Sequence, residues 1–276
     1  MLGVTVLVDE CRWPWRNRLW CHLVSDASFD ELHRFARQLG IPRVAFQGDH
    51  YDLDETGRSA ALSFGATEVG GRDLVRALKA SGLRRGPNVW RGGMSAVASM
   101  DAPRLTTERL VLRQWQPTDF EFARKLDTDP KIMKLMGGTR TAEQTIAQLN
   151  QDAVGLALRG IGKWAVELQS NHELVGRVGL GGVNDALPFG PALQLGWRMS
   201  SKYQGFGFAT EAARAALIYA FDVLEVERVA AITVPHNHAS LSVMAKLGMH
   251  DDGEFDHPSF GESDPLRRHV LKWANR

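Results

Sequence analysis

The residues that most clearly indicate a chemistry lie in the stretch KYQGFGFATEA, residues 202–212. Two glycines, Gly205 and Gly207, come directly before a run of residues with helical spacing. Small residues let backbone N–H groups approach a phosphate closely, and the N-terminal end of the following helix adds partial positive charge. The stretch therefore predicts a loop that binds phosphates through the backbone amides from Gly205 to Thr210.

Two common phosphate-binding loops do not fit this spacing. A dinucleotide loop has the pattern G-x-G-x-x-G after the first strand of a βαβ unit, but position 210 is threonine and the stretch comes late in the chain. A Walker P-loop needs a lysine directly after its last glycine, and Gly207 is followed by Phe208. A glycine-rich connector that binds nothing stays an alternative for the stretch taken alone.

The elements that must position this loop can be predicted from the hydrophobic pattern around it. Residues 193–199, LQLGWRM, predict a strand before the loop, and residues 210–224 predict a helix with one apolar face after it. The other elements predicted in this half are a strand within 104–115, a hairpin over 163–183 with its turn at 170–172, a strand over 228–234, a helix over 240–248 and a last strand over 266–274.

Between its strand and its helix, the loop contains the pattern Q-x-x-G-x-A at Gln204, Gly207 and Ala209. This pattern resembles the acyl-CoA loop of the GCN5-related N-acetyltransferase (GNAT) superfamily. LTTERLVLRQWQPTDF resembles the opening strand and helix of the branch with the ribosomal-protein N-terminal acetyltransferases, and residues 195–249 resemble its central motif. The resemblance covers about residues 103–276. It implies an α/β GNAT fold, with a mixed, largely antiparallel central sheet whose central strands are splayed, flanked by helices.

The resemblance implies acetyl-CoA as co-substrate and an N-acetyltransferase. The acetyl group would pass to a primary amine, of a protein N-terminus or a small molecule, by direct attack on the thioester. A CoA-binding sensor or scaffold without turnover is the alternative. The implied acetyl-CoA-binding residues are Trp197, Arg198, Met199, Gln204, Gly205, Phe206, Gly207, Phe208, Ala209, Thr210 and Asn237. Asn237 also has a simpler interpretation, as the cap of the predicted helix that follows it.

The reaction also needs a group that protonates the departing thiolate. Many relatives carry a tyrosine at the position of Met244, and methionine has no proton to give. The ribosomal-protein branch has a serine near the sulfur that matches Ser240, so Ser240 is the predicted proton donor. Relatives in that branch carry a glutamate as base at the position that is Ser259 in this chain. We take His257 as the candidate base instead, because the ordinary pKa of histidine suits the task. A water chain to a carboxylate, or no dedicated base, are alternatives.

The first half of the sequence predicts a small α/β domain. Strands are predicted over 4–9 and 43–47, and helices over 28–40, 55–65 and 71–82. Ser28 and Glu31 have capping-box spacing at the start of the first helix. The segment resembles a small uncharacterised bacterial and phage domain family, and that resemblance implies no activity.

Polar residues gather at the predicted strand ends of this domain, at Asp9, Asp49, His50 and Asp52. Open α/β sheets often place sites there, so a metal-dependent, nucleotide-acting domain is one interpretation. Turn and helix-cap chemistry uses the same residues, and we adopt it and assign no metal site. A zinc site of Cys11, Cys21 and His22 would need a spacing that matches no standard zinc motif, so we interpret the cysteines as reduced thiols.

Composition and charge limit the partners. Lys and Arg number 33 against 32 Asp and Glu, and the net charge of +1 gives no argument for binding nucleic acid or a membrane. No signal peptide is evident, so we expect a cytoplasmic protein. A homodimer is left open.

Residues 84–103 carry Gly, Pro, Asn and Ser without a period, which predicts an accessory domain over 1–86, a linker over 87–102 and the GNAT domain over 103–276.

Overall fold

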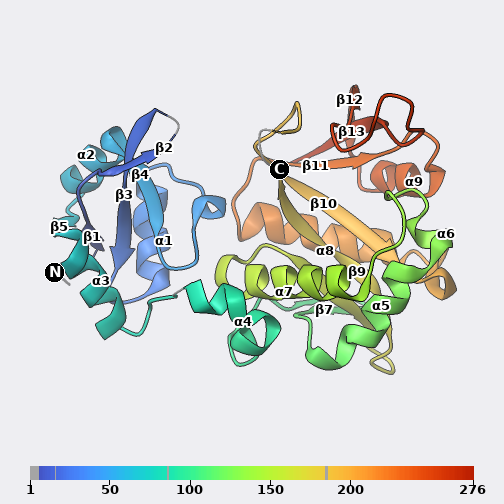
Figure 1. Cartoon of the computed structure of the whole chain (residues 1–276), viewed down its shortest axis with the longest axis horizontal. Helices are drawn as coiled ribbons and strands as arrows, with labels where there is room; N and C mark the ends of the chain where they lie inside the picture. The colour runs from blue at the N-terminus through green and yellow to red at the C-terminus, as the bar shows by residue number, and fades with distance from the viewer. Residues whose placement is uncertain (1–5, 16, 86, 184–185) are drawn as a thin grey trace. The chain divides into compact units, whose positions relative to one another are not determined.

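The computed structural model describes residues 6–15, 17–85, 87–183 and 186–276 (Figure 1). The chain divides into two compact units, residues 1–88 and 89–276. None of the helices in the described part of the chain combines the length and the apolar character that a membrane span needs.

The N-terminal unit is a small α/β domain built on a five-stranded sheet. Its strands are β1 (Val6–Val8), β2 (Trp13–Trp15), β3 (Arg18–Ser25), β4 (Tyr51–Asp54) and β5 (Thr67–Glu68). Its helices are α1 (Phe29–Gln38), α2 (Glu55–Ser63) and α3 (Gly71–Ala80). Strand β3 is central, because it pairs antiparallel with β1, β2 and β4. Apolar side chains from these strands and from α1 form one buried core.

The start of α1 is as predicted, since the Ser28 side chain accepts a hydrogen bond of 3.1 Å from the Glu31 amide. The strand predicted over 43–47 is wrong. Residues Arg43–Ala45 form a 3-10 turn that begins after Pro42. The long strand that pairs with β1 is β3 instead. The hydrophobic pattern missed β3 because its first half, from Arg18 to Trp20, is largely exposed in a hairpin and mixes arginine with tryptophan.

The C-terminal unit contains an eight-stranded sheet in the order β12-β13-β11-β10-β9-β8-β7-β6. The strands are β6 (Leu105–Thr106), β7 (Leu110–Arg113), β8 (Lys163–Leu168), β9 (Leu174–Val183), β10 (Ala192–Met199), β11 (Arg228–Thr233), β12 (His250–Asp256) and β13 (Arg268–Asn275). Among the strand pairings described in this eight-stranded sheet, only the β10–β11 pair is parallel. The expected mixed, largely antiparallel sheet is confirmed, and β12 is an edge strand that the sequence pattern did not predict.

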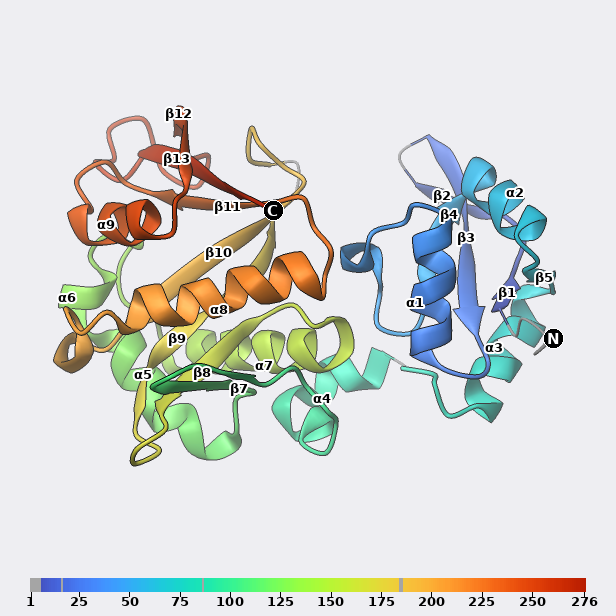
Figure 2. The same cartoon turned by 180° about the vertical axis from the view of Figure 1, so that it is seen from behind.

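Helices cover both faces of this sheet. They are α5 (Phe120–Thr128), α6 (Pro130–Met133), α7 (Ala142–Arg159), α8 (Phe208–Asp222) and α9 (His238–Lys246). Helices α5 and α7 lie on one face and α8 lies on the other, as the two opposite views show (Figures 1 and 2). Alanines 212, 213, 216 and 220 of α8 are buried, and their small side chains let this helix pack closely on the sheet.

The segment predicted as a linker contains a helix, α4 (Pro87–Val97), with a break at Gly93, where φ is 57°. Because the helix is broken at Gly93, its hydrophobic residues do not follow one continuous helical period, and the sequence pattern therefore predicted a linker. Met94 and Val97 are buried in the same cluster as Trp115 and Leu149. The Met94 amide also donates to the Asn150 side chain at 3.0 Å. The end of α4 therefore packs with the C-terminal unit.

Candidate active site

The two parallel central strands separate soon after they meet. Strand β10 pairs with β9 over its whole length, from Ala192 to Met199, but its register with β11 holds a single pair, Gln194 with Ala230. Beyond Gln194, the edge of β10 that faces β11 has no described ladder partner. Backbone N–H and C=O groups on such an edge need other hydrogen-bond partners. The gap therefore offers a ligand an extended row of backbone donors and acceptors.

The glycine loop follows the open end of β10. Gly205 and Gly207 have φ angles of 85° and 81°, a left-handed conformation that glycine adopts without steric cost. Gly207 is the N-cap of α8, and no side chain caps this helix. The first amides of α8 are thus left for an anion, and the helix dipole favours negative charge there. The Gln204 side chain donates to the Met199 carbonyl at 3.3 Å and fixes the start of the loop.

An arginine that sequence reasoning missed fixes the far side of this loop. The Arg109 side chain donates to the Phe206 carbonyl at 3.1 Å, and its guanidinium lies 4.6 Å from the centre of the Phe208 ring. The same arginine donates to Glu211 at 2.7 Å, and Thr107 donates to Glu211 at 2.6 Å. The turn before β7 therefore holds the loop and the first turn of α8 in place.

Ser240 and Asn237 lie where β11 ends and α9 begins. Asn237 is the N-cap of α9, because its side-chain oxygen accepts from the Ser240 amide at 3.2 Å. Its side-chain nitrogen donates to the Ser240 hydroxyl oxygen at 3.0 Å and to Thr233 at 2.9 Å. The Ser240 hydroxyl thus accepts a hydrogen bond and keeps its own proton for another acceptor. The parallel strands β10 and β11 end at the same edge of the sheet, so α9 begins at the edge where the gap opens.

The ring of His257, the candidate base, is held by contacts within its own part of the chain. The residue follows β12, and its Nδ1 accepts from the Ser259 amide at 3.2 Å. A neutral His257 therefore carries its proton on Nε2. Its ring packs against His269 and Phe260, with centroid distances of 4.9 and 5.4 Å, and burial lowers its pKa.

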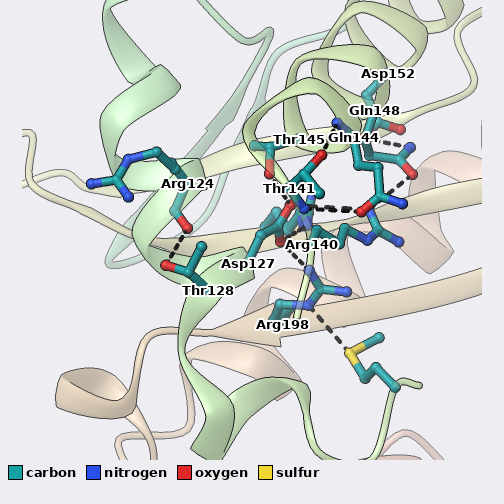
Figure 3. A network of polar contacts seen from close by, with 12 residues as sticks. Arg124, Asp127, Thr128, Arg140, Thr141, Gln144, Thr145, Gln148, Asp152 and Arg198 are labelled. Atoms are coloured by element: carbon teal, nitrogen blue, oxygen red, sulfur yellow. Dashed lines mark hydrogen bonds and ion pairs between the residues drawn. The ribbon is translucent and has the colours of Figure 1, made fainter. Parts of the chain in front are cut away.

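The Arg198 side chain enters a buried ion-pair network beside the gap (Figure 3). Arg177 and Arg198 are cross-strand partners on β9 and β10, and both donate to the fully buried Asp127 of α5. Thr145 of α7 donates to the other oxygen of Asp127 at 3.1 Å, and Arg140 lies 4.0 Å from it. The signal in the sequence was weak, because these residues are far apart in the chain and resemble ordinary surface charges.

This network contains more positive charge than negative charge. Its cations are Arg140, Arg177, Arg198 and Lys163, and its carboxylates are Asp127 and Asp152. Burial and the neighbouring arginines lower the pKa of Lys163, and they lower the pKa of Arg198 to about 9. Arg177 is 2% exposed, yet its Nη1 has no hydrogen-bond partner among the described residues. Unbalanced buried cations of this kind favour a bound anion.

The family model of the acetyltransferase (GNAT) domain matches residues 109–250, just over half of the chain's 276 residues. The chain belongs to the GNAT acetyltransferase family. It is an N-acetyltransferase, and acetyl-CoA is its co-substrate. Ahead of the GNAT domain, residues 6–81 match the DUF4031 family, described as proteins of unknown function.

Known proteins similar to this chain share the GNAT domain. The uncharacterized N-acetyltransferase YnaD of Bacillus subtilis is 31% identical over 153 residues, which cover 55% of this chain and 85% of YnaD. A GNAT-family acetyltransferase structure from Bacillus anthracis is 26% identical, with a TM-score of 0.53, and the match covers 63% of this chain and 98% of that one. The structure of RimL, a ribosomal L7/L12 alpha-N-protein acetyltransferase in complex with coenzyme A, is 14% identical to this chain, with a TM-score of 0.53. The match covers 63% of this chain and 98% of the RimL chain, and at this identity it shows the fold alone.

Proposed function

We propose that the GNAT domain transfers the acetyl group by direct attack of a primary amine, and that the acceptor carries a negatively charged group close to this amine. The observation that carries the proposal is the excess positive charge of the Arg140–Arg177–Arg198 cluster beside the gap between β10 and β11.

The acetyl-CoA-binding residues keep their expected roles in this proposal. The amides from Gly205 to Thr210 bind the pyrophosphate, and the backbone of Trp197, Arg198 and Met199 binds pantetheine. The left-handed glycines and the uncapped N-terminus of α8 support the first role, and the unpaired edge of β10 supports the second. Asn237 orients Ser240, and Ser240 protonates the thiolate.

The arginine cluster serves the acceptor in two ways. An acceptor carboxylate would pair with Arg198 and with Arg140, whose side chain is 32% exposed. The positive charge that the cluster keeps after this pairing disfavours another cation nearby, and it therefore lowers the pKa of the acceptor's ammonium group. The amine then loses its proton to water more readily, which fits a reaction without a dedicated base. A polyamine, which carries several positive charges, would be repelled.

The experiment is release of the CoA thiol by the full chain with pairs of amines that differ only in charge. Each pair consists of an amino acid or acidic peptide and its ester or amide, and spermidine serves as a polycation. We expect kcat/KM to be roughly tenfold higher for the acid than for its uncharged partner, or about 1.4 kcal/mol. The variant Arg140→Gln should remove most of this preference. Arg124→Gln is the matched control, since Arg124 lies on α5 outside the cluster (Figure 3). Its side chain pairs with Glu121 instead.

The outcomes separate the parts of the proposal. Equal rates for acid and ester, or a preference for spermidine, would refute the anionic acceptor and leave acetyl transfer intact. A preference for the acid that survives in Arg140→Gln and in Arg198→Met would show that the cluster does not recognise the acceptor.

A further inference from the structure

Two histidines and three aspartates of the N-terminal unit converge on one place, and acetyl transfer does not use them. His22 of β3 and Asp52 of β4 are Cα partners across the two strands, and His50 directly precedes β4. One ligand atom of each of these three residues lies within 4.8 Å of those of the other two. His50 Nε2 and Asp52 Oδ1 are 3.4 Å apart, and the two imidazole rings lie 5.1 Å apart.

Each imidazole is held at Nδ1 by its own carboxylate. Asp9 Oδ2 lies 3.1 Å from His22 Nδ1, and Asp49 Oδ1 lies 2.6 Å from His50 Nδ1. With Nδ1 donating to a carboxylate, the neutral imidazole presents the lone pair of Nε2. A carboxylate behind each histidine is the usual support of histidine metal ligands, because it fixes both the tautomer and the ring orientation.

The supporting carboxylates are themselves fixed and buried. Asp9 Oδ1 accepts from the His22 amide at 2.6 Å, and Asp49 Oδ2 accepts from Arg84 at 3.0 Å and from the Arg85 amide at 2.7 Å. Asp9 is 5% exposed and Asp49 is 2% exposed. Turn and cap chemistry, the interpretation adopted from the sequence, does not account for two histidines arranged in this way.

We propose that His22, His50 and Asp52 bind one first-row divalent transition-metal ion such as Zn²⁺, through the two Nε2 atoms and a carboxylate oxygen. Imidazole nitrogens suit such ions, whereas Mg²⁺ and Ca²⁺ prefer oxygen ligands throughout. The Asp52 side chain is 40% exposed, so an ion can enter from solvent. Three protein ligands leave a coordination position for water or a substrate oxygen, which is the arrangement of catalytic rather than structural zinc sites.

The ligand set differs from the acidic cluster and from the cysteine set that were considered from the sequence. Cys21 neighbours His22 on β3 and therefore points to the opposite face of the sheet, where its thiol donates to the Leu53 carbonyl at 3.4 Å. The Cys11 sulfur lies 4.0 Å from the same carbonyl oxygen, so neither thiol belongs to the site. Asp9, which the sequence placed among candidate ligands, supports His22 from behind, and His22 takes its place as a ligand.

The test is isothermal titration of the tag-free, chelator-treated full chain with ZnCl₂, and separately with MgCl₂. We expect one Zn²⁺ per chain and no saturable Mg²⁺ binding. The variants His50→Ala and Asp52→Asn should weaken Zn²⁺ binding, each by roughly tenfold or more, and Asp49→Asn should weaken it by about 10–100-fold through the position of His50. His172→Ala is the control, because His172 is 76% exposed and lies in the other unit.

Two further measurements keep the test decisive. Asp52→Asn removes an exposed charge and should leave the unit folded by circular dichroism, so weaker binding in this variant cannot be blamed on unfolding. Co²⁺ in place of Zn²⁺ should give visible absorption bands of a four- or five-coordinate ion that disappear in His50→Ala. Equal Zn²⁺ affinity in all variants, or Mg²⁺ binding as tight as Zn²⁺ binding, would overturn the proposal.

Discussion

Ser240 belongs to the start of α9 and is also the proton donor that we propose for the reaction. Its amide donates to Asn237 as part of the cap, while its hydroxyl accepts from the same side chain and keeps its proton. Replacement by alanine removes the hydroxyl and leaves the cap bond to the amide. The structural and chemical roles of Ser240 can therefore be separated by mutation.

For Ser240→Ala we expect kcat to fall by about 100-fold, because the thiolate loses its proton donor, with little change in the KM for acetyl-CoA. Steady-state thiol release measures both constants. Ser242→Ala, on the exposed side of the same helix, is the matched control and should keep full turnover. Full turnover in Ser240→Ala would contradict the assigned role.

We expect His33 to make the N-terminal unit sensitive to acid. The residue is buried, with Nδ1 2.8 Å from the Tyr51 hydroxyl, and burial lowers its pKa to about 3. The unfolded chain, with an ordinary His pKa, binds the proton first as the pH falls, so stability decreases from about pH 6.5 toward pH 3. We expect a loss of about 2 kcal/mol between pH 7 and pH 5 that is absent in His33→Gln. Urea unfolding of both proteins at the two pH values measures this difference.

Among the elements, the glycine loop was predictable and the arginine cluster was not. Gly205 and Gly207 need left-handed backbone, and this local requirement is visible in the sequence. Asp127, Arg140, Arg177 and Arg198 come together only through the register of β9 with β10 and the packing of α5 and α7. Nothing in their local sequence distinguishes them from exposed charges. The sequence suggests His22 only together with the two cysteines, whereas its partners in the structure lie on other elements.

Gly207 joins the loop to α8, and its replacement tests the loop as a unit. In Gly207→Ala the new methyl group meets only the tip of Arg109 at 3.5 Å, but the φ angle of 81° strains an alanine by about 1 kcal/mol. We expect the KM for acetyl-CoA to rise by roughly tenfold. Gly253→Ala, at a φ of 84° in β12, should cost similar stability and leave this KM unchanged. An unchanged KM in Gly207→Ala would contradict the role of the loop.

For the whole molecule, α4 decides where the C-terminal unit begins. A chain that starts at Pro103 lacks Met94 and Val97, two buried side chains of its core. Each contributes about 1.5–3 kcal/mol by burial, so we expect the shorter unit to be less stable by roughly 3 kcal/mol or more. Thermal unfolding of residues 87–276 and of residues 103–276 measures the difference. Equal midpoints would place the boundary at 103, as the sequence predicts.

If Arg198 binds the acceptor as proposed, its contact with Met136 makes acceptor binding sensitive to oxidation. The Met136 sulfur lies 3.2 Å from Arg198 Nε, and its side chain is exposed. Oxidation to the sulfoxide adds an oxygen that accepts hydrogen bonds far better than the thioether does. That oxygen would occupy Arg198 and compete with the acceptor's anionic group. Mild peroxide treatment should therefore raise the KM for acidic amines, methionine sulfoxide reductase should reverse the change, and Met136→Leu should resist it.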